Sequence, residues 1–251
     1  MTGGDGADDT AGIAAAQPGA ASERGSFDES DHGRFTEWLR ERSEPDWTAA
    51  TEHRFTAELA DDTVDDEVFG RYIVADYRFV ETLTSTVGYA AAQAPTVDAK
   101  ARLAGFLETV TTDETDYFER SFDALGVPDS ERGDAPQRAV TREFDDLLRR
   151  ASHEGGYAET LAVFVPAEWI YLTWATRASE GDRPDRFYLD EWIDLHAVEA
   201  FETFVTWLQA ELDAVGPTLS ARRQRRVAHL FERTVELEVA FFDAAYHAES
   251  A

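Results

Sequence analysis

From Phe35 almost to the end of the chain, apolar residues recur at the three- and four-residue spacing of helices, and no segment alternates like a strand. The pattern breaks where turn-forming residues occur, at Pro95, Gly126, Gly155, Gly181 and Gly216. These breaks predict about seven helices, at 35–60 (with Pro45 as a candidate break), 65–92, 97–125, 136–153, 157–179, 188–214 and 219–247. Helices of this length pack into bundles. The sequence therefore predicts an all-α, single-domain helical bundle over 34–251.

Residues 1–33 precede the helical pattern and are rich in Gly, Ala, Asp and Ser, which predicts a disordered acidic N-terminal tail. The whole chain carries 51 Asp and Glu against 23 Lys and Arg, a formal charge of -28, and Lys100 is its only lysine. Concentrated salt shortens the Debye length to about 3 Å and so screens the self-repulsion of such a surface. We therefore expect a halophilic protein that does not bind nucleic acid.

The chain contains no cysteine, which excludes disulfides, thiolate metal ligands and a thiol nucleophile. No run of about 18 apolar residues is present, so no membrane-spanning helix is expected. The acidic start of the chain differs from the basic and apolar regions of a signal peptide. We expect a cytoplasmic protein with no membrane partner.

Three of the expected helices place a carboxylate inside their apolar stripe: Asp76, Glu168 and Glu238. Each has apolar residues three or four positions away on both sides, a spacing that puts them on one helix face. Burying an unpaired carboxylate is costly, so each is expected to be paired, protonated or turned toward a polar ligand. A single one is as well explained by an inward arginine or a helix cap. Three together predict a site.

His196 extends this group, because it shares a face of the expected helix 188–214 with Ile193, Ala200, Phe204 and Trp207. A lone histidine on such a face is more often a satisfied core residue than a ligand contact. Aromatic residues crowd the same helices and are also usually core. Beside inward carboxylates, however, they suit a flat ring that stacks on them while an acid bonds its ring nitrogens. The sequence thus favours a small heterocyclic ligand.

Four segments resemble, in order, the motifs of the TenA/thiaminase II family. They are His53–Thr63 with Phe69, Tyr72, Asp76, Tyr77 and Phe79; Pro166–Tyr171; Glu191–Asp194 with Phe201; and Glu238–Tyr246. The resemblance covers about 35–247 and implies the haem-oxygenase-like fold, usually as a homotetramer. It also implies hydrolysis of thiamin-derived aminopyrimidines, which releases hydroxymethylpyrimidine for salvage. We expect no cofactor and no metal.

The same resemblance implies that Asp76 holds the pyrimidine and that Glu238 handles protons at the ring. The nucleophilic cysteine of the family falls at Ala167, so attack by a thiolate is impossible here. Resemblance to members without the cysteine implies a glutamate in its place, for which Glu168 is the candidate. We assign Glu168 as base and Glu238 as acid in the attack of water on an amino- or formylaminomethyl pyrimidine. The expected substrate contacts are Asp76, Phe79, Tyr171, His196 and Phe241.

Two other functions stay open at this point. The departures at Ala167, Val140 and His196 also suit a pyrimidine-binding or regulatory homologue that has lost catalysis. A di-metal oxidase on the same fold is the second alternative, because Asp243 and His247 have helical ligand spacing. Such sites use several Glu-x-x-His pairs, and the chain contains a single one, Glu29 and His32, which precedes the helical pattern.

Overall fold

The structure, a computed structural model, describes residues 25–132 and 138–247, and these fold into α-helices and short 3₁₀ turns with no strand among them. The long helices are α4 (Asp66–Gln93), α5 (Val97–Leu125), α7 (Ala139–Glu154), α8 (Tyr157–Ser179), α10 (Glu199–Val215) and α11 (Ala221–Ala245). The shorter elements are η2 (Phe27–Glu29), α1 (Phe35–Arg42), α2 (Asp46–Thr51), α3 (Arg54–Ala60), α6 (Asp129–Arg132), α9 (Phe187–Ala197) and η3 (Gly216–Thr218). The all-α prediction is confirmed.

The expected helix 35–60 is three helices, which is one reason why the prediction of about seven was too low. Pro45, the candidate break, lies between α1 and α2. The second break comes at His53, whose extended backbone starts α3 and whose Nδ1 accepts a hydrogen bond from the amide of Phe55 at 3.1 Å. A histidine that caps a helix in this way carries no signal in an apolar periodicity.

The expected helix 188–214 is also wrong, because it is divided at Val198 into α9 and α10. Val198 is extended, with φ −68° and ψ 142°. Its carbonyl accepts hydrogen bonds from two backbone amides in the first turn of α10. The change of direction separates His196, which is buried, from Ala200, which is exposed. The predicted stripe from Ile193 to Trp207 therefore does not exist as one continuous face.

The segment before α1 is described only in part. Residues 1–24, most of the expected tail, lie outside the described residues, as does the expected helix start at Pro136. Phe27, by contrast, packs on the first helix, with its ring centroid 5.2 Å from that of Phe35 and 5.9 Å from that of Trp38. The apolar contacts of Phe27 thus attach η2 to the helical core.

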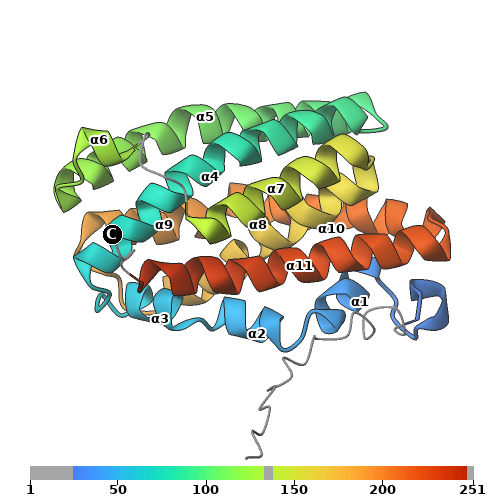
Figure 1. Ribbon diagram of the computed structural model, residues 1–251, viewed down its shortest axis with the longest axis horizontal. Coiled ribbons are helices and arrows are strands. Elements are labelled where there is room, and N and C mark those ends of the chain that lie inside the picture. Colours follow the sequence, from blue (N-terminus) through green and yellow to red (C-terminus); the bar gives the residue numbers. More distant parts are fainter. Residues whose placement is uncertain (1–24, 133–137, 248–251) are drawn as a thin grey trace, which may run out of the picture.

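Helix α8 is the centre of the fold. Figure 1 shows α4 and α5 along one side of the molecule and α11 with α1 to α3 along the other, and α8 packs against α2, α4, α7, α9, α10 and α11. Every residue from Ala158 to Glu168 is buried, as expected for a helix that is apolar on all sides. Pro166 lies inside this stretch, two residues before Glu168. Because proline has no N–H, the helix lacks one backbone hydrogen bond there.

One charge is buried near the start of α8 and is fully paired. Glu159 accepts hydrogen bonds from Arg223 Nε at 3.0 Å and Arg223 Nη2 at 2.7 Å, and from the amide of Gly156 at 3.1 Å. Burial alone would raise the pKa of Glu159, but these hydrogen bonds hold it below its ordinary value. The pair ties α11 to the N-terminus of α8.

We predict that Glu159→Ala lowers the free energy of unfolding by about 1–2 kcal/mol, because it removes the hydrogen bonds of a buried carboxylate to the half-exposed Arg223 and to the start of α8. Denaturant unfolding in high salt measures this. Asp116→Ala, which breaks an exposed pair with Arg120 on α5, is the matched control and should change stability little. Equal effects of the two substitutions would contradict the structural role given to Glu159.

Candidate active site

A cavity enclosed by α4, α5, α8, α9 and α11 brings together residues that are far apart in the sequence. Six of the seven predicted site residues line it: Asp76, Phe79, Glu168, Tyr171, His196 and Glu238. Phe241 does not line the cavity but packs behind it, with ring centroids 6.2 Å from Phe79 and 5.8 Å from Tyr72. The inward stripes of three separate helices therefore meet at one place.

The three carboxylates are buried, with exposed fractions of 6% for Asp76, 7% for Glu168 and 2% for Glu238. No lysine or arginine occurs among the residues that line the cavity, all of which belong to the described part of the chain. The wall therefore carries acidic but no basic side chains. In such a setting burial and mutual repulsion both favour protonation.

Burial raises the pKa of Glu238 well above its ordinary value, and the charges of Asp76 and Glu168 raise it further. Burial also raises the pKa of Asp76, to about 7, although a hydrogen bond from Tyr171 opposes the shift. The protonated form of Glu238, which can donate a proton, is therefore favoured, and Asp76 exists in both forms near pH 7. Neighbouring carboxyl groups with separated pKa values can divide the roles of acid and base.

Two tyrosines orient Asp76. The hydroxyl groups of Tyr72 and Tyr171 lie 2.8 Å apart, and the hydroxyl of Tyr171 is 3.4 Å from Oδ1 of Asp76. Burial raises the pKa of both tyrosines well above the ordinary value, so both stay protonated. Because Tyr171 donates its single proton to Asp76, Tyr72 donates to Tyr171. The hydrogen bond from Tyr171 to Asp76 is long, at 3.4 Å, so Asp76 remains available to a ligand.

His196 supplies a neutral acceptor. Its Nδ1 lies 2.9 Å from the carbonyl oxygen of Trp192, which can only accept, so Nδ1 carries the proton and Nε2 has a free lone pair. Burial lowers the pKa of His196 to about 4, and the ring is therefore uncharged at neutral pH. Its ring centroid lies 5.0 Å from that of Tyr171 and 4.4 Å from that of Trp192.

Five residues that line the cavity were not assigned to the site from the sequence: Val80, Leu83, Phe106, Val110 and Trp192. Phe106 and Val110 of α5 close one side of the cavity, and Trp192 of α9 lies against His196. Trp192 is 1% exposed, and a hydrogen bond between its side chain and Tyr72 works against the effect of burial on the pKa of Tyr72. The position of Trp192 in the Trp-Ile segment was a usable signal, whereas an apolar residue on α5 looks the same whether it faces core or cavity.

The geometry gives little support to the di-metal alternative. Asp243, needed for the di-metal alternative, is 63% exposed, and its Oδ1 lies 3.2 Å from His53 Nε2. Across the described residues, no three His, Asp or Glu side chains are grouped as metal ligands would be.

None of the described helices combines the length and apolarity needed to cross a membrane.

We predict that Asp76→Asn flattens the pH dependence of stability. Asp76 has a pKa of about 7 when folded and about 3.8 when unfolded, so the folded state binds more protons between these values and the free energy of unfolding falls as pH rises through them. The loss amounts to roughly 4 kcal/mol for a shift of this size. Urea unfolding from pH 4 to pH 8 should show wild type losing more stability than Asp76→Asn, with Asp116→Asn behaving as wild type. Parallel curves for all three proteins would disprove the assignment.

Comparisons with known proteins agree on one family. The TENA/THI-4/PQQC family matches residues 40–248. An aminopyrimidine aminohydrolase of Halalkalibacterium halodurans is 22% identical over 85% of this chain and 96% of its own length. Among solved structures, one described as a TenA family transcription regulator from a Silicibacter species has a TM-score of 0.76 at 21% identity, over 85% of this chain and 96% of that one. A TenA homologue from Pyrococcus furiosus also has a TM-score of 0.76 at 21% identity, over 84% of this chain and all of that one.

The match spans the helices that carry every wall of the cavity, from α4 to α11. The solved structures share the arrangement of the backbone at low sequence identity, so they speak for the fold. The match to the family covers most of the chain and both ends of the cavity-forming region. The chain is a member of the TENA/THI-4/PQQC family.

Proposed function

We propose that this protein is an aminopyrimidine hydrolase of thiamin salvage that works with carboxylates in place of a cysteine. The observation that carries the proposal is the convergence of Asp76, Glu168 and Glu238 on one buried cavity whose wall has Ala167 at the family's cysteine position. The relative from Halalkalibacterium halodurans, named an aminopyrimidine aminohydrolase, supports the substrate class.

The cavity is small, about 40 Å³, and the groups that line it match the edge of an aminopyrimidine rather than the whole ring. Such a ring presents an amino donor beside a ring-nitrogen acceptor, and a protonated Asp76 offers the matching acceptor and donor on its two oxygens. The pKa of about 7 makes that form available at neutral pH. His196 Nε2 can accept a further N–H, while Phe79 and Tyr171 offer aromatic surface to the ring.

Hydrolysis then needs one base and one acid. Glu168 takes a proton from water as its oxygen attacks, and Glu238 gives its proton to the leaving nitrogen. At an aminomethyl group the C–N bond is replaced by a C–O bond, so the products are the hydroxymethyl pyrimidine and ammonia. At a formylaminomethyl group water adds to the formyl carbon, and formate and the aminomethyl pyrimidine are released.

We predict that Glu168→Gln and Glu238→Gln each lower kcat by at least about a hundredfold, the usual loss for a general acid or base. Ammonia release from an aminomethyl pyrimidine, assayed in concentrated KCl, measures turnover. Glu108→Gln on the exposed face of α5 is the control and should retain full activity. Unchanged turnover in both cavity variants would refute the carboxylate mechanism.

A pyrimidine-binding homologue without catalysis is the second candidate, and the observation in its favour is Ala167 itself, which leaves the cavity wall without a nucleophile. Calorimetry distinguishes the two. Tight binding of the aminopyrimidine with no ammonia released by wild type would favour the binder. A homo-oligomer, a cytoplasmic location and adaptation to high salt stay predictions from the sequence.

We predict that Ala167→Cys creates a thiol that a small alkylating reagent labels and that an aminopyrimidine protects. Ala167 lines the cavity, whereas Ala162 lies on the same helix, is completely buried and does not. Ala162→Cys should therefore resist labelling with or without ligand. Mass spectrometry measures the modified fraction. Labelling of Ala167→Cys that the ligand does not slow would argue against pyrimidine binding in this cavity.

A further inference from the structure

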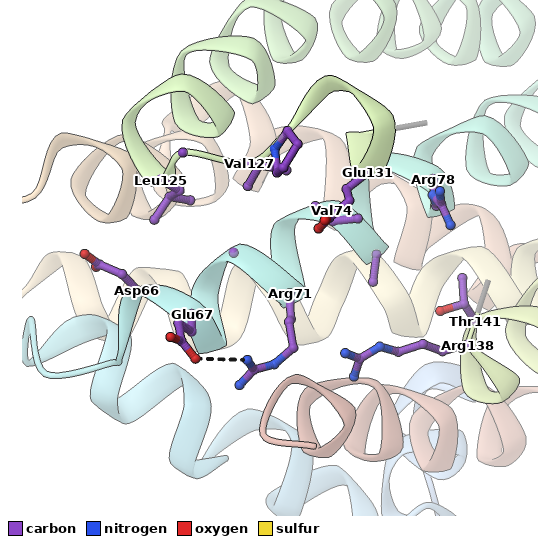
Figure 2. A pocket seen from close by; sticks show the side chains of 14 residues that line it. Asp66, Glu67, Arg71, Val74, Arg78, Leu125, Val127, Glu131, Arg138 and Thr141 are labelled. Carbon is purple, nitrogen blue, oxygen red and sulfur yellow. Dashed lines mark ion pairs between the residues drawn. The ribbon is translucent and has the colours of Figure 1, made fainter. Parts of the chain in front are cut away.

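A second hollow, of about 470 Å³, lies between α4, the turn that joins α5 to α6, and the start of α7 (Figure 2). It shares no lining residue with the carboxylate cavity. Helix α4 contributes to both, since Arg71, Val74 and Arg78 lie on one of its faces and Asp76 on another. The two sites are therefore distinct but are built on the same helix.

Arg78 is the unusual residue of this hollow. Its Nε and Nη2 are buried and make no hydrogen bond, and no other arginine in the described ranges has buried nitrogen atoms in that condition. A buried carboxyl group can lose its charge by taking up a proton, but a guanidinium stays charged at any physiological pH. Arg78 is only partly buried as a whole, but each of these two buried N–H donors left without an acceptor costs about 1–3 kcal/mol. The geometry thus calls for an anion.

Two further arginines hold fixed positions beside it. Arg71 Nε donates to the carbonyl of Ala245 at 2.7 Å, and Arg138 Nη1 donates to the carbonyl of Ala244, both at the end of α11. Figure 2 shows the side chains of Arg71 and Arg138 next to each other, with Arg78 further along the same hollow. Arginines fixed in this way lose less conformational entropy when they bind an anion.

The carboxylates that line the hollow do little to neutralise Arg71 and Arg78. Asp66 already accepts hydrogen bonds from Arg186 and from Tyr188, each at 2.7 Å. Glu67 is 88% exposed, and its nearest approach to Arg71 is 3.8 Å, a distance at which a surface pair contributes little. Glu131 is exposed. A positive region therefore remains on a chain whose formal charge is -28.

The other wall of the hollow is apolar and is formed by Val74, Ala75, Leu125, Val127 and Pro128. Guanidinium groups bind phosphate oxygens through paired N–H donors, and an apolar wall beside them suits an organic group attached to the phosphate. We propose that this hollow binds a small phosphorylated organic molecule, with Arg78 as the principal contact to the phosphate and the apolar wall against the organic part.

The test is calorimetry in concentrated KCl with three probes: phenyl phosphate, inorganic phosphate and phenol. We expect one phenyl phosphate to bind per chain, more tightly than inorganic phosphate, and phenol not to bind. Arg78→Gln should weaken phenyl phosphate at least tenfold, while Arg102→Gln, at an exposed arginine on α5, should leave the affinity unchanged.

Val74→Glu gives a second test that does not depend on losing Arg78. The new carboxylate would lie four residues before Arg78 on the same helix face, the spacing of a helical ion pair, and would occupy the guanidinium from within. It should abolish phenyl phosphate binding. The proposal is overturned if phenyl phosphate binds Arg78→Gln or Val74→Glu as well as wild type, if inorganic phosphate binds as tightly as phenyl phosphate, or if chloride displaces both completely.

Discussion

Helix α8 is packed on every side, and the positions of the cavity walls follow from that packing. Because Ala158 to Glu168 are all buried, the helix cannot turn about its axis without disrupting close packing on every side, and Glu168 is held toward the cavity. The Glu159 and Arg223 pair fixes the other end of the same stretch against α11, the helix that carries Glu238. The packing that stabilises the fold therefore also sets the spacing of the two proposed catalytic acids.

Such a cavity opposes stability. Three carboxyl groups are buried in its wall, and protonation of Glu238 and partly of Asp76 lowers the cost of burying them. The protons that make burial tolerable are also the ones that the proposed reaction uses. A ligand that bonds to Asp76 and Glu238 would offset the remaining cost, so the free site is less stable than the occupied one.

The sequence was most informative where one strong periodicity ran unbroken. Helices α4, α5, α8 and α11 were predicted nearly to their ends, and the inward carboxylates were found because a charge stands out in an apolar stripe. The division at Val198 was not predicted, since a single extended residue between two helical patterns leaves their spacing almost unchanged. Phe106 was missed because, unlike a charge, an apolar residue that lines a cavity has the same sequence pattern as one in the core.

The arginine-lined hollow shows a different limit of sequence reasoning. In the sequence, Arg78 looks like any other cation on the polar side of a helix. Only in the structure do its two buried nitrogens without hydrogen-bond partners distinguish it from a solvated residue. Asp76, two positions earlier, is buried too, but its charge is relieved by a proton. A guanidinium has no such route, because it is a permanent cation at physiological pH. The same helix thus carries one buried charge that the protein can neutralise by itself and one that needs an anion from outside.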